Sequence, residues 1–391
     1  MLTRLTLTDF RNYRGLDLVF SRPLVAFVGN NGIGKTNILE AISLLTAGRG
    51  LRRAALGTLS RVDGPGGWSL AARLEQDGYE HRIGTGLGPQ EAGRRVRIDG
   101  EEARTSEALL DYMRVLWLVP AMDGLFIGPA GDRRRFLDRL TLSLNPAHGR
   151  MVTDFEKALR QRNRGLEQGA SAQVLTALER QVAELGMAVS LARAETVRLL
   201  SATLDDQEPE PEAAAPDAPA PASFPQAVLG LEGEFESRFA GLPASDAEAL
   251  YMQALAEGRA RDRAAGRTLF GPHLSDLTVL HRAKGMPAAQ SSTGEQKALL
   301  IGLVLAHADL TARVTGRAPV LLLDEVAAHL DPGRRKALFD RLLRLGGQVF
   351  MTGTDAALFE ALPVESEIFA ITAQGARALS LPGARETGDT P

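Results

Sequence analysis

A short stretch near the start of the chain constrains the fold more than any other. An apolar run at 24–28, typical of a buried strand, leads into a loop that ends in Gly34–Lys35–Thr36, and a helical pattern follows from Asn37. Counted from Gly29 the spacing is G-x-x-x-x-G-K-T, the pattern of a phosphate-binding loop between a strand and a helix. Glycines let backbone N–H groups approach phosphate, and the start of the helix adds the positive end of its dipole. The stretch predicts a nucleoside triphosphate site.

Each residue type in this phosphate-binding loop, residues 29–36, has a role in holding a triphosphate. We expect Lys35 to reach the β- and γ-phosphates and Thr36 to place its hydroxyl on Mg²⁺. A Gly-rich turn with a chance Lys–Thr pair is the alternative, and the flanking strand and helix argue against it. The expected nucleotide contacts are Gly29, Asn30, Asn31, Gly32, Ile33, Gly34, Lys35, Thr36 and Asn37.

A second apolar run, residues 320–323, ends in two carboxylates, Asp324 and Glu325. Continuous apolar runs are typical of parallel strands buried on both faces, and ligands bind at the carboxyl ends of such strands. We expect Asp324 to hold Mg²⁺ or its water, and Glu325 to orient and deprotonate the attacking water. Alternatively, the two carboxylates have no role in binding, and the strand simply ends at solvated acidic residues. The presence of a phosphate-binding loop in the same chain argues against this alternative.

The segment Ser292–Thr293–Gly294–Glu295 predicts the start of a helix with two properties. Serine followed three residues later by glutamate is a capping box. A free hydroxyl and a glycine at a helix N-terminus also form a site for an anion. We therefore expect Ser292 and Gly294 to begin a second phosphate-binding helix.

Composition limits the possible partners. The net charge of −3 means that any nucleic-acid surface must be a local basic patch. Absence of cysteine excludes disulfides and Cys-based zinc sites. The alternating residues 2–7 predict a strand rather than a signal peptide, and no run of apolar residues is long enough to span a membrane. We expect a cytoplasmic protein. The candidate DNA contacts are Arg49, Arg52, Arg53, Arg133, Arg134 and Arg135, which equally suit solvated helix faces or internal ion pairs.

The order of these motifs, followed by His329–Leu330–Asp331, resembles the ATP-binding-cassette ATPases. In detail the chain resembles the RecF family of bacterial recombination mediators, related to the SMC-like ATPases, more closely than any transporter. The resemblance covers the chain apart from residues 205–223 and the C-terminal tail. It rests on the segments Phe10–Tyr13, Gly29–Asn37, Arg134–Asp138, Gly271–His273, Thr293–Lys297 and Leu321–Glu325.

This resemblance implies an α/β fold: a phosphate-binding-loop ATPase head of the cassette type with an inserted, mainly helical second lobe. It implies a weak, DNA-stimulated ATPase that uses ATP and Mg²⁺ and dimerises when ATP fills two sites. Each site would use the phosphate-binding loop of one subunit and the signature helix of the other, so Asp331 and Thr352 join Ser292 and Gly294 as expected nucleotide contacts. The implied partners are double-stranded and gapped or junction DNA, and RecO and RecR, with which the family helps to load the RecA recombinase.

The 391 residues predict two domains, or one domain with a large insertion. We expect residues 1–112 and 267–381 to form the two parts of the ATPase head, the first with an antiparallel β layer. Residues 113–266 are expected to form the helical lobe, because the apolar spacing from 150 to 204 predicts two antiparallel helices in a short coiled hairpin. Residues 205–223, acidic and rich in Pro and Ala, are expected to be a disordered loop, and 382–391 a flexible tail.

Three other classes of protein share these nucleotide motifs. A transporter ATPase subunit would not explain the helical hairpin or the Phe10–Tyr13 segment, and Thr352 stands near the place where transporters carry a histidine. Chromosome-organising proteins with the same head need much longer coiled arms. A regulatory switch that never hydrolyses its nucleotide would not need Glu325. The chain departs from the RecF pattern at two places. Ala121 follows Pro120 where RecF-like chains usually carry an acidic residue, and Leu274 follows His273 where they usually carry a basic one.

Overall fold

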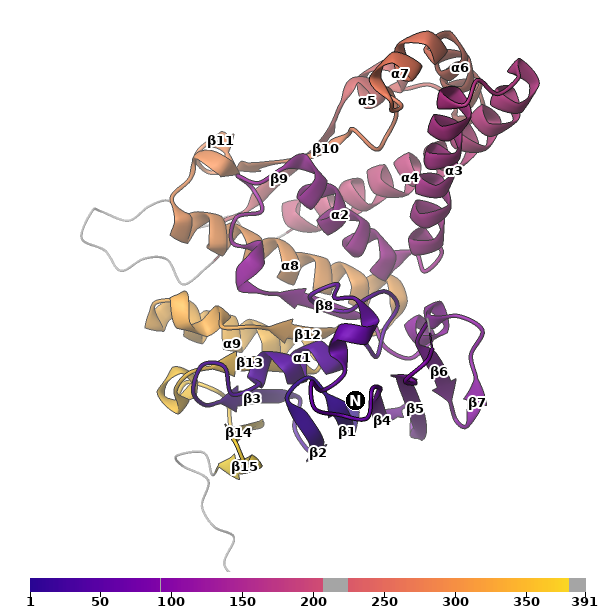
Figure 1. The fold of residues 1–391 in the computed structure, drawn as a ribbon. Coiled ribbons are helices and arrows are strands. Elements are labelled where there is room, and N and C mark those ends of the chain that lie inside the picture. The colour runs from indigo at the N-terminus through magenta and orange to yellow at the C-terminus, as the bar shows by residue number, and fades with distance from the viewer. Residues whose placement is uncertain (92, 207–223, 380–391) are drawn as a thin grey trace, which may run out of the picture. The chain divides into compact units, whose positions relative to one another are not determined.

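A computed structural model describes residues 1–91, 93–206 and 224–379 (Figure 1). The described chain divides into two compact units. Of the described residues, the first unit contains mainly 1–122 and 311–379, and the second contains mainly 123–206 and 225–310. The loop expected at 205–223 lies outside the described residues from 207 on, as does the tail expected at 382–391.

A mainly parallel sheet forms the centre of the first unit. Its strand order is β15-β14-β3-β13-β12-β8, and every neighbouring pair is parallel except β14 and β15. The apolar runs predicted as buried strands are β3 and β12, and both are buried along their whole length. The strands are β3 (Leu24–Val28), β8 (Val115–Leu118), β12 (Val320–Leu323), β13 (Val349–Gly353), β14 (Ser366–Thr372) and β15 (Gly375–Leu379).

An antiparallel sheet, in the order β2-β1-β4-β5-β6-β7, forms the second layer of this unit. Apolar and polar residues alternate along its strands, so one face is buried, as the leucines of β1 and β4 show. Helix α1 (Lys35–Ser43) contacts β1 of this sheet and β13 of the parallel sheet, and its Ile38 and Ile42 belong to the core of the unit. The strands are β1 (Leu2–Phe10), β2 (Tyr13–Val19), β4 (Trp68–Gln76), β5 (Tyr79–Leu87), β6 (Arg95–Ile98) and β7 (Glu101–Glu102).

The second unit is mainly helical, with a small antiparallel sheet in the order β11-β10-β9. Phe155, Val182, Phe235, Tyr251 and Phe270 are members of its apolar core. Its strands are β9 (Ala227–Glu232), β10 (Asp276–His281) and β11 (Met286–Pro287). Its helices are α2 (Ala130–Leu144), α3 (His148–Glu167), α4 (Ala172–Asp205), α5 (Glu234–Phe239), α6 (Ala244–Glu257), α7 (Arg259–Ala265) and most of α8 (Thr293–Thr315).

The remaining helices are short, apart from α9 (Pro332–Leu345) in the first unit. Short 3₁₀-helices of three to six residues lie between the longer elements. They are Leu56–Leu59, Ser106–Asp111, Pro120–Met122, Ala288–Gln290, Val326–His329 and Ala356–Phe359.

The predicted helical hairpin corresponds to α3 and α4, which contact each other across the turn at residues 168–171. The helices are unequal, at 20 and 34 residues, and Ser171 caps the second by accepting a hydrogen bond from the N–H of Val174. The described part of the chain contains one helix, α8, that is long and apolar enough to cross a membrane, and 72% of its apolar window is buried.

The two units do not follow the expected lobe of 113–266. Strand β8 pairs in parallel with β12, so residues 115–118 belong to the first unit. Strand β10 pairs with β9, so the second unit continues through residues 276–281 to Leu310 and contains the signature segment 292–295. Pairing between distant strands, which local sequence patterns do not encode, sets these limits.

Candidate nucleotide site

The register of three parallel strands brings the predicted site residues to one edge of the sheet. Strand β13 lies between β3 and β12, and it pairs Val28 with Gly353 and Leu323 with Met351. The phosphate-binding loop follows β3, Asp324 follows β12, and Thr352 lies near the end of β13. All three therefore lie at the carboxyl ends of adjacent strands. This is the edge at which parallel sheets of α/β proteins bind their ligands.

The phosphate-binding loop requires glycine at specific points. Gly34 precedes α1 as its N-cap with a φ of 117°, and a Cβ there would lie 2.6 Å from Asn12 Nδ2 and from the Tyr13 hydroxyl. A Cβ at Gly29, whose φ is 150°, would lie 2.6 Å from the carbonyl oxygen of Ile371. Larger residues at these positions would force the loop apart from its neighbours.

Lys35 is the first residue of α1 and is 4% exposed. Its Nζ donates hydrogen bonds to the carbonyl oxygens of Gly29 at 2.6 Å and Asn30 at 3.0 Å. Burial lowers the pKa of Lys35, and the negative charges of Glu325 and Asp324 oppose that change. The ammonium group is therefore held against the inside of the loop, close enough to both carboxylates to feel their charge.

Two hydroxyl groups hold the carboxylate of Asp324, which is 6% exposed. Thr36 Oγ1 shares its one hydrogen between Asp324 Oδ1 at 2.9 Å and Oδ2 at 3.1 Å, and Thr352 Oγ1 donates to Oδ1 at 2.7 Å. The first hydroxyl comes from α1 and the second from β13. Asp324 thus connects the start of the helix to the middle of the sheet.

The donor set fits Mg²⁺. The hydroxyl of Thr36 and the carboxylate of Asp324 supply only oxygen, which this hard cation prefers. Within the described ranges no group of three or more His, Cys, Asp or Glu residues is placed to hold a metal. One carboxylate and one hydroxyl suit Mg²⁺ bound together with water and phosphate, since Mg²⁺ keeps several waters and seldom uses an all-protein cage.

Glu325 adopts a backbone conformation that is uncommon for its residue type. Its φ of 55° and ψ of 20° lie in the left-handed region, which costs a non-glycine residue about 1–2 kcal/mol. The N–H of Glu325 donates to Thr352 Oγ1 at 3.0 Å. Strained backbone of this kind is concentrated at functional sites, so the conformation supports a special role for this carboxylate.

A polar network supports the phosphate-binding loop from the segment Phe10–Tyr13. Asn12 Nδ2 donates to the carbonyl oxygen of Ile33 at 2.9 Å, and Asn37 Nδ2 donates to Asn12 Oδ1 at 2.8 Å. Arg52 donates to Asn37 Oδ1 at 2.8 Å and to Glu40 at 3.0 Å. Sequence reasoning singled out Asn12 only through resemblance, and no local pattern connects it to the loop.

Buried Glu40 anchors the other end of this network. It accepts hydrogen bonds from Arg11 Nε at 2.8 Å and Nη2 at 2.7 Å, in addition to the bond from Arg52. The Glu40 side chain is 2% exposed, and two guanidinium groups compensate its charge. Sequence reasoning missed Glu40, although a glutamate on the apolar side of α1 is a signal that could have indicated it.

The other expected nucleotide contacts lie at helix starts. Asp331 precedes α9 and accepts a hydrogen bond from the N–H of Arg334 at 2.9 Å, as an N-cap does. Ser292 and Gly294 are exposed and belong to the second unit. The predicted capping box is present, because Glu295 N donates to Ser292 Oγ at 3.4 Å and Ser292 N donates to Glu295 Oε2 at 3.0 Å.

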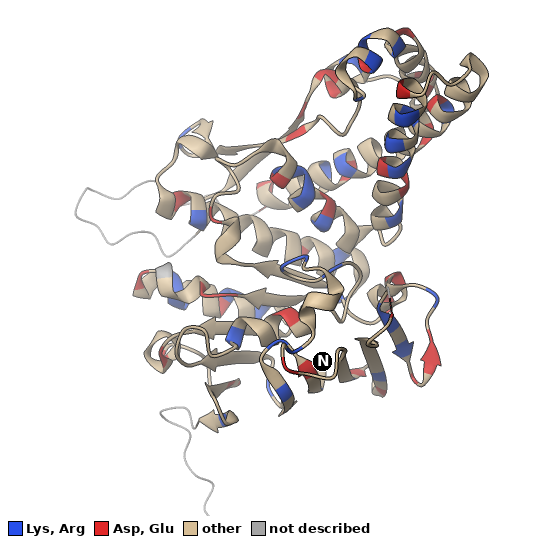
Figure 2. Cartoon of the chain, viewed as in Figure 1, with Lys and Arg blue, Asp and Glu red and all other residues tan. Residues whose placement is uncertain are grey.

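The arginines proposed to contact DNA fall into two groups. Arg133 donates to Asp276 at 2.8 and 2.7 Å, and Arg134 donates to the carbonyl oxygen of Ser275 at 2.7 Å, so both hold the second unit together. Arg52 contacts Asn37 and Glu40, and Arg135 contacts Asp132, whereas Arg49 and Arg53 are exposed and have no such contact among the described residues. Figure 2 shows basic and acidic residues interspersed along the helices of the second unit. Exposed Arg49 and Arg53 are therefore the better candidates for contact with phosphate.

Arg193 connects two of the segments that carry the RecF resemblance. It donates to Asp138 at 2.8 and 2.9 Å, and to the carbonyl oxygen of Pro272 at 2.7 Å. His148 also contacts Asp138, at 2.8 Å. Burial raises the pKa of Asp138, but the hydrogen bonds to His148 and Arg193 outweigh it, and the pKa lies below its usual value. These segments act within the second unit as structural partners.

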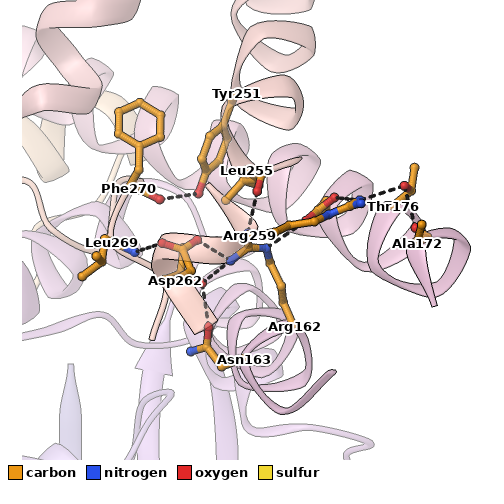
Figure 3. Close-up of polar contacts among 12 residues, drawn as sticks. Arg162, Asn163, Ala172, Thr176, Tyr251, Leu255, Arg259, Asp262, Leu269 and Phe270 are labelled. Atoms are coloured by element: carbon orange, nitrogen blue, oxygen red, sulfur yellow. Dashed lines mark hydrogen bonds and ion pairs between the residues drawn. The ribbon is translucent and has the colours of Figure 1, made fainter. Parts of the chain in front are cut away.

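Sequence reasoning also missed a buried ionic cluster in the second unit (Figure 3). The side chain of Arg162 in α3 is fully buried and donates to Asp262 at 2.8 Å, to Thr268 at 2.9 Å and to the carbonyl oxygen of Leu255 at 2.6 Å. Its Nε also contacts Glu179 of α4 at 3.3 Å. An arginine on the apolar face of a helix, between Leu159 and Leu166, was the available signal.

Comparison with known proteins gives a consistent result. Residues 1–377 match the family model described as the RecF/RecN/SMC N terminal domain. The chain is 54% identical over 364 residues to the DNA replication and repair protein RecF of Mesorhizobium japonicum, covering 92% of this chain and 93% of that protein. It is 51% identical over 373 residues to the same protein of Rhizobium etli, covering 95% and 96%.

Solved structures agree on the fold. The recombination mediator protein RecF with ATP, of the RecFOR pathway, matches with a TM-score of 0.80 and 21% identity, covering 97% of each chain. An Smc head domain from Pyrococcus furiosus, bound to the C-terminal domain of ScpA, matches with a TM-score of 0.52 and 16% identity, covering 97% of this chain and 96% of that one. The expected α/β head of the RecF and SMC type is confirmed.

Proposed function

This chain belongs to the RecF family, within the RecF/RecN/SMC group, and from that membership we propose that it is an ATP-binding DNA repair protein of the RecFOR pathway. It binds ATP at the edge of the parallel sheet and hydrolyses it slowly. The observation that carries the proposal is the meeting of Thr36, Asp324 and Thr352 beside the phosphate-binding loop. A transporter subunit is not supported by any observation.

Each residue at this edge has a task in the proposed reaction. Lys35 neutralises charge on the β- and γ-phosphates, and backbone N–H groups of the loop bind their oxygens. Thr36 and Asp324 hold Mg²⁺, which when bound neutralises charge that develops during phosphoryl transfer. Glu325 accepts the proton of the attacking water and orients it. Its half-buried carboxylate is near enough to Lys35 to interact electrostatically.

The second part of the proposal concerns assembly. ATP brings two copies of the chain together, and the helix that starts at Ser292 and Gly294 completes the site of the other copy. Support comes from the exposed capping box, whose serine hydroxyl and helix N-terminus suit an anion. Asp331, at the start of α9, lies near this shared site in the proposed dimer. Hydrolysis removes the γ-phosphate and lets the two copies separate.

The proposed dimer acts in the cytoplasm on double-stranded DNA and on gapped or junction DNA. With RecO and RecR it helps to load the RecA recombinase. The relatives in Mesorhizobium and Rhizobium that support this assignment are named as DNA replication and repair proteins. Exposed Arg49 and Arg53 supply local positive charge on a chain whose net charge is −3.

The test is a comparison of ATP hydrolysis by the wild-type chain and by Lys35→Ala, with and without double-stranded DNA. We expect slow hydrolysis that DNA increases. Lys35→Ala should lose ATP affinity, because it removes a positive charge from the triphosphate site. The exposed Lys336→Ala serves as the control and should behave as wild type. A wild-type chain that neither binds nor hydrolyses ATP would refute the proposal.

A further inference from the structure

The hydroxyl of Thr352 lies at the junction of the two carboxylate residues. Thr352 is 1% exposed at the carboxyl end of β13. Its Oγ1 donates to Asp324 Oδ1 at 2.7 Å and accepts from the N–H of Glu325 at 3.0 Å. One hydroxyl therefore contacts the side chain of one site residue and the backbone of the next.

The hydrogen-bonding capacity of a threonine limits what else this group can do. A hydroxyl has one hydrogen to donate, and in Thr352 that hydrogen goes to Asp324. A phosphate oxygen is an acceptor and would need the same hydrogen. The expectation that Thr352 contacts the nucleotide therefore competes with a hydrogen bond that Thr352 already makes to a buried carboxylate, in a geometry set by the pairing of β12 with β13.

The register of the sheet fixes this arrangement. Strand β13 is parallel to β12, with Leu323 opposite Met351, so Thr352 is next to Asp324 at the end of the pair. Asp324 also accepts from Thr36, which begins the helix after the phosphate-binding loop. The carboxylate is consequently fixed from two sides, by Thr36 and by Thr352, and its position depends on both.

The same hydroxyl also stabilises the unusual backbone of Glu325. A left-handed conformation persists only where surrounding contacts enforce it, and the bond from Glu325 N to Thr352 is such a contact. Without an acceptor, a part-buried N–H would be left unpaired. The backbone would then gain by rotating, and the Glu325 carboxylate would move with it.

We propose that Thr352 is a positioning residue, through which β13 sets the direction of the Asp324 carboxylate and the backbone of Glu325. The inference rests on the proposed function, because that function gives Asp324 and Glu325 their tasks. It changes the expected task of Thr352 from binding the nucleotide to orienting the residues that act on it.

Two substitutions separate the hydroxyl from the shape of the side chain. Thr352→Val keeps the volume and removes both hydrogen bonds, whereas Thr352→Ser keeps both bonds. Thr354→Val, at an exposed position two residues further on, is the matched control. ATP affinity is measured by titration with a non-hydrolysable fluorescent analogue, once in EDTA and once in Mg²⁺, and hydrolysis is measured separately. Melting temperatures show whether each variant folds, and Thr352→Ala replaces the valine variant if that one does not.

In EDTA, Thr352→Val should bind the analogue like wild type. The gain in affinity on adding Mg²⁺ and the hydrolysis rate should both fall, by about 10–100-fold, the usual effect of removing a partner behind a metal ligand. Thr352→Ser should restore both quantities, and Thr354→Val should match wild type. A valine variant with wild-type hydrolysis and Mg²⁺ response would overturn the inference, as would a serine variant as impaired as valine, or a loss of affinity in EDTA.

These outcomes differ from failure of the proposed function. If wild type binds ATP but does not hydrolyse it, the proposed activity is wrong, and the comparison of affinities in EDTA and Mg²⁺ still decides the role of Thr352. If wild type hydrolyses ATP and Thr352→Val does so equally well, the proposed activity stands and the positioning role is wrong.

Discussion

At the scale of single residues, two adjacent carboxylates have different surroundings. Asp324 accepts hydrogen bonds from Thr36 and Thr352, whereas the Glu325 carboxylate accepts none from the part of the chain that the structure describes. A bonded carboxylate is suited to hold an ion, and one that is free to accept a proton is suited to act as a base. This difference gives Glu325 the catalytic task in the proposed reaction.

Glu325→Gln should therefore separate binding from hydrolysis. The amide keeps the shape of the side chain but cannot accept a proton, so hydrolysis should fall by about 10²–10⁴-fold, the usual contribution of a general base. ATP affinity should stay near wild type, and the ATP-bound dimer should persist in gel filtration. Exposed Glu360→Gln is the control for loss of a charge. Hydrolysis at the wild-type rate would show that Glu325 is not the base.

The sequence alone predicts those site residues that stand close together in a short, recognisable segment. Glycines, Lys35 and Thr36 follow one another within a single loop, and Asp324 and Glu325 directly follow an apolar run. The bonds made by Thr352 depend on which strand lies beside β12 and in what register. No pattern within residues 348–353 contains that information, so the contact was beyond sequence reasoning.

At the scale of secondary-structure elements, the buried cluster around Arg162 joins four helices of the second unit. Arg162 lies in α3, Glu179 in α4, Leu255 in α6 and Asp262 in α7. Arg259 of α7 also contacts Glu179, at 2.9 Å. Apolar spacing predicts the helices, but an arginine among apolar positions gives no indication of which helix supplies its partner.

Arg162→Met should strongly destabilise the second unit. It removes one partner of a buried ion pair and leaves the Asp262 carboxylate without a charged partner, which typically costs about 3–5 kcal/mol. Arg160→Met, on the same helix but with a side chain 66% exposed, should change the free energy of unfolding by less than about 0.5 kcal/mol. Chemical denaturation of the full chain, followed by circular dichroism, measures both. Equal stability of the two variants would show that the cluster contributes nothing.

At the scale of the whole molecule, the proposed dimer makes a prediction about mixtures. Ser292→Arg should bind ATP but stay monomeric, since the larger cationic side chain blocks the helix start from the other copy. Mixed with Lys35→Met it should regain part of its hydrolysis, because the first chain supplies an intact phosphate-binding loop and the second an intact serine. Ser245→Arg, exposed elsewhere on the second unit, is the control. Absence of rescue, with wild type monomeric in ATP, would exclude a shared site.

DNA binding provides a second prediction at this scale. The double variant Arg49→Ala, Arg53→Ala should bind all DNA sequences more weakly, and by the same factor. The slope of log affinity against log salt concentration should also become shallower, by about 0.9 for each DNA phosphate that the variant no longer neutralises. Exposed Arg150→Ala, paired with Asp154, is the control. Affinity measured at several salt concentrations decides the matter. Unchanged affinity in the double variant would show that the DNA-binding surface does not include Arg49 and Arg53.

The position of β3 has a consequence for synthesis of the protein on the ribosome. This strand, at residues 24–28, leads into the phosphate-binding loop, yet both of its neighbours, β13 and β14, come from residues 349–372. Contacts so distant along the chain form late, and domains of a growing chain fold as they emerge. The phosphate-binding loop should therefore take its final position only after β13 and β14 have been synthesised. A nascent chain stalled before Val349 should not retain a fluorescent ATP analogue, whereas the released full chain should.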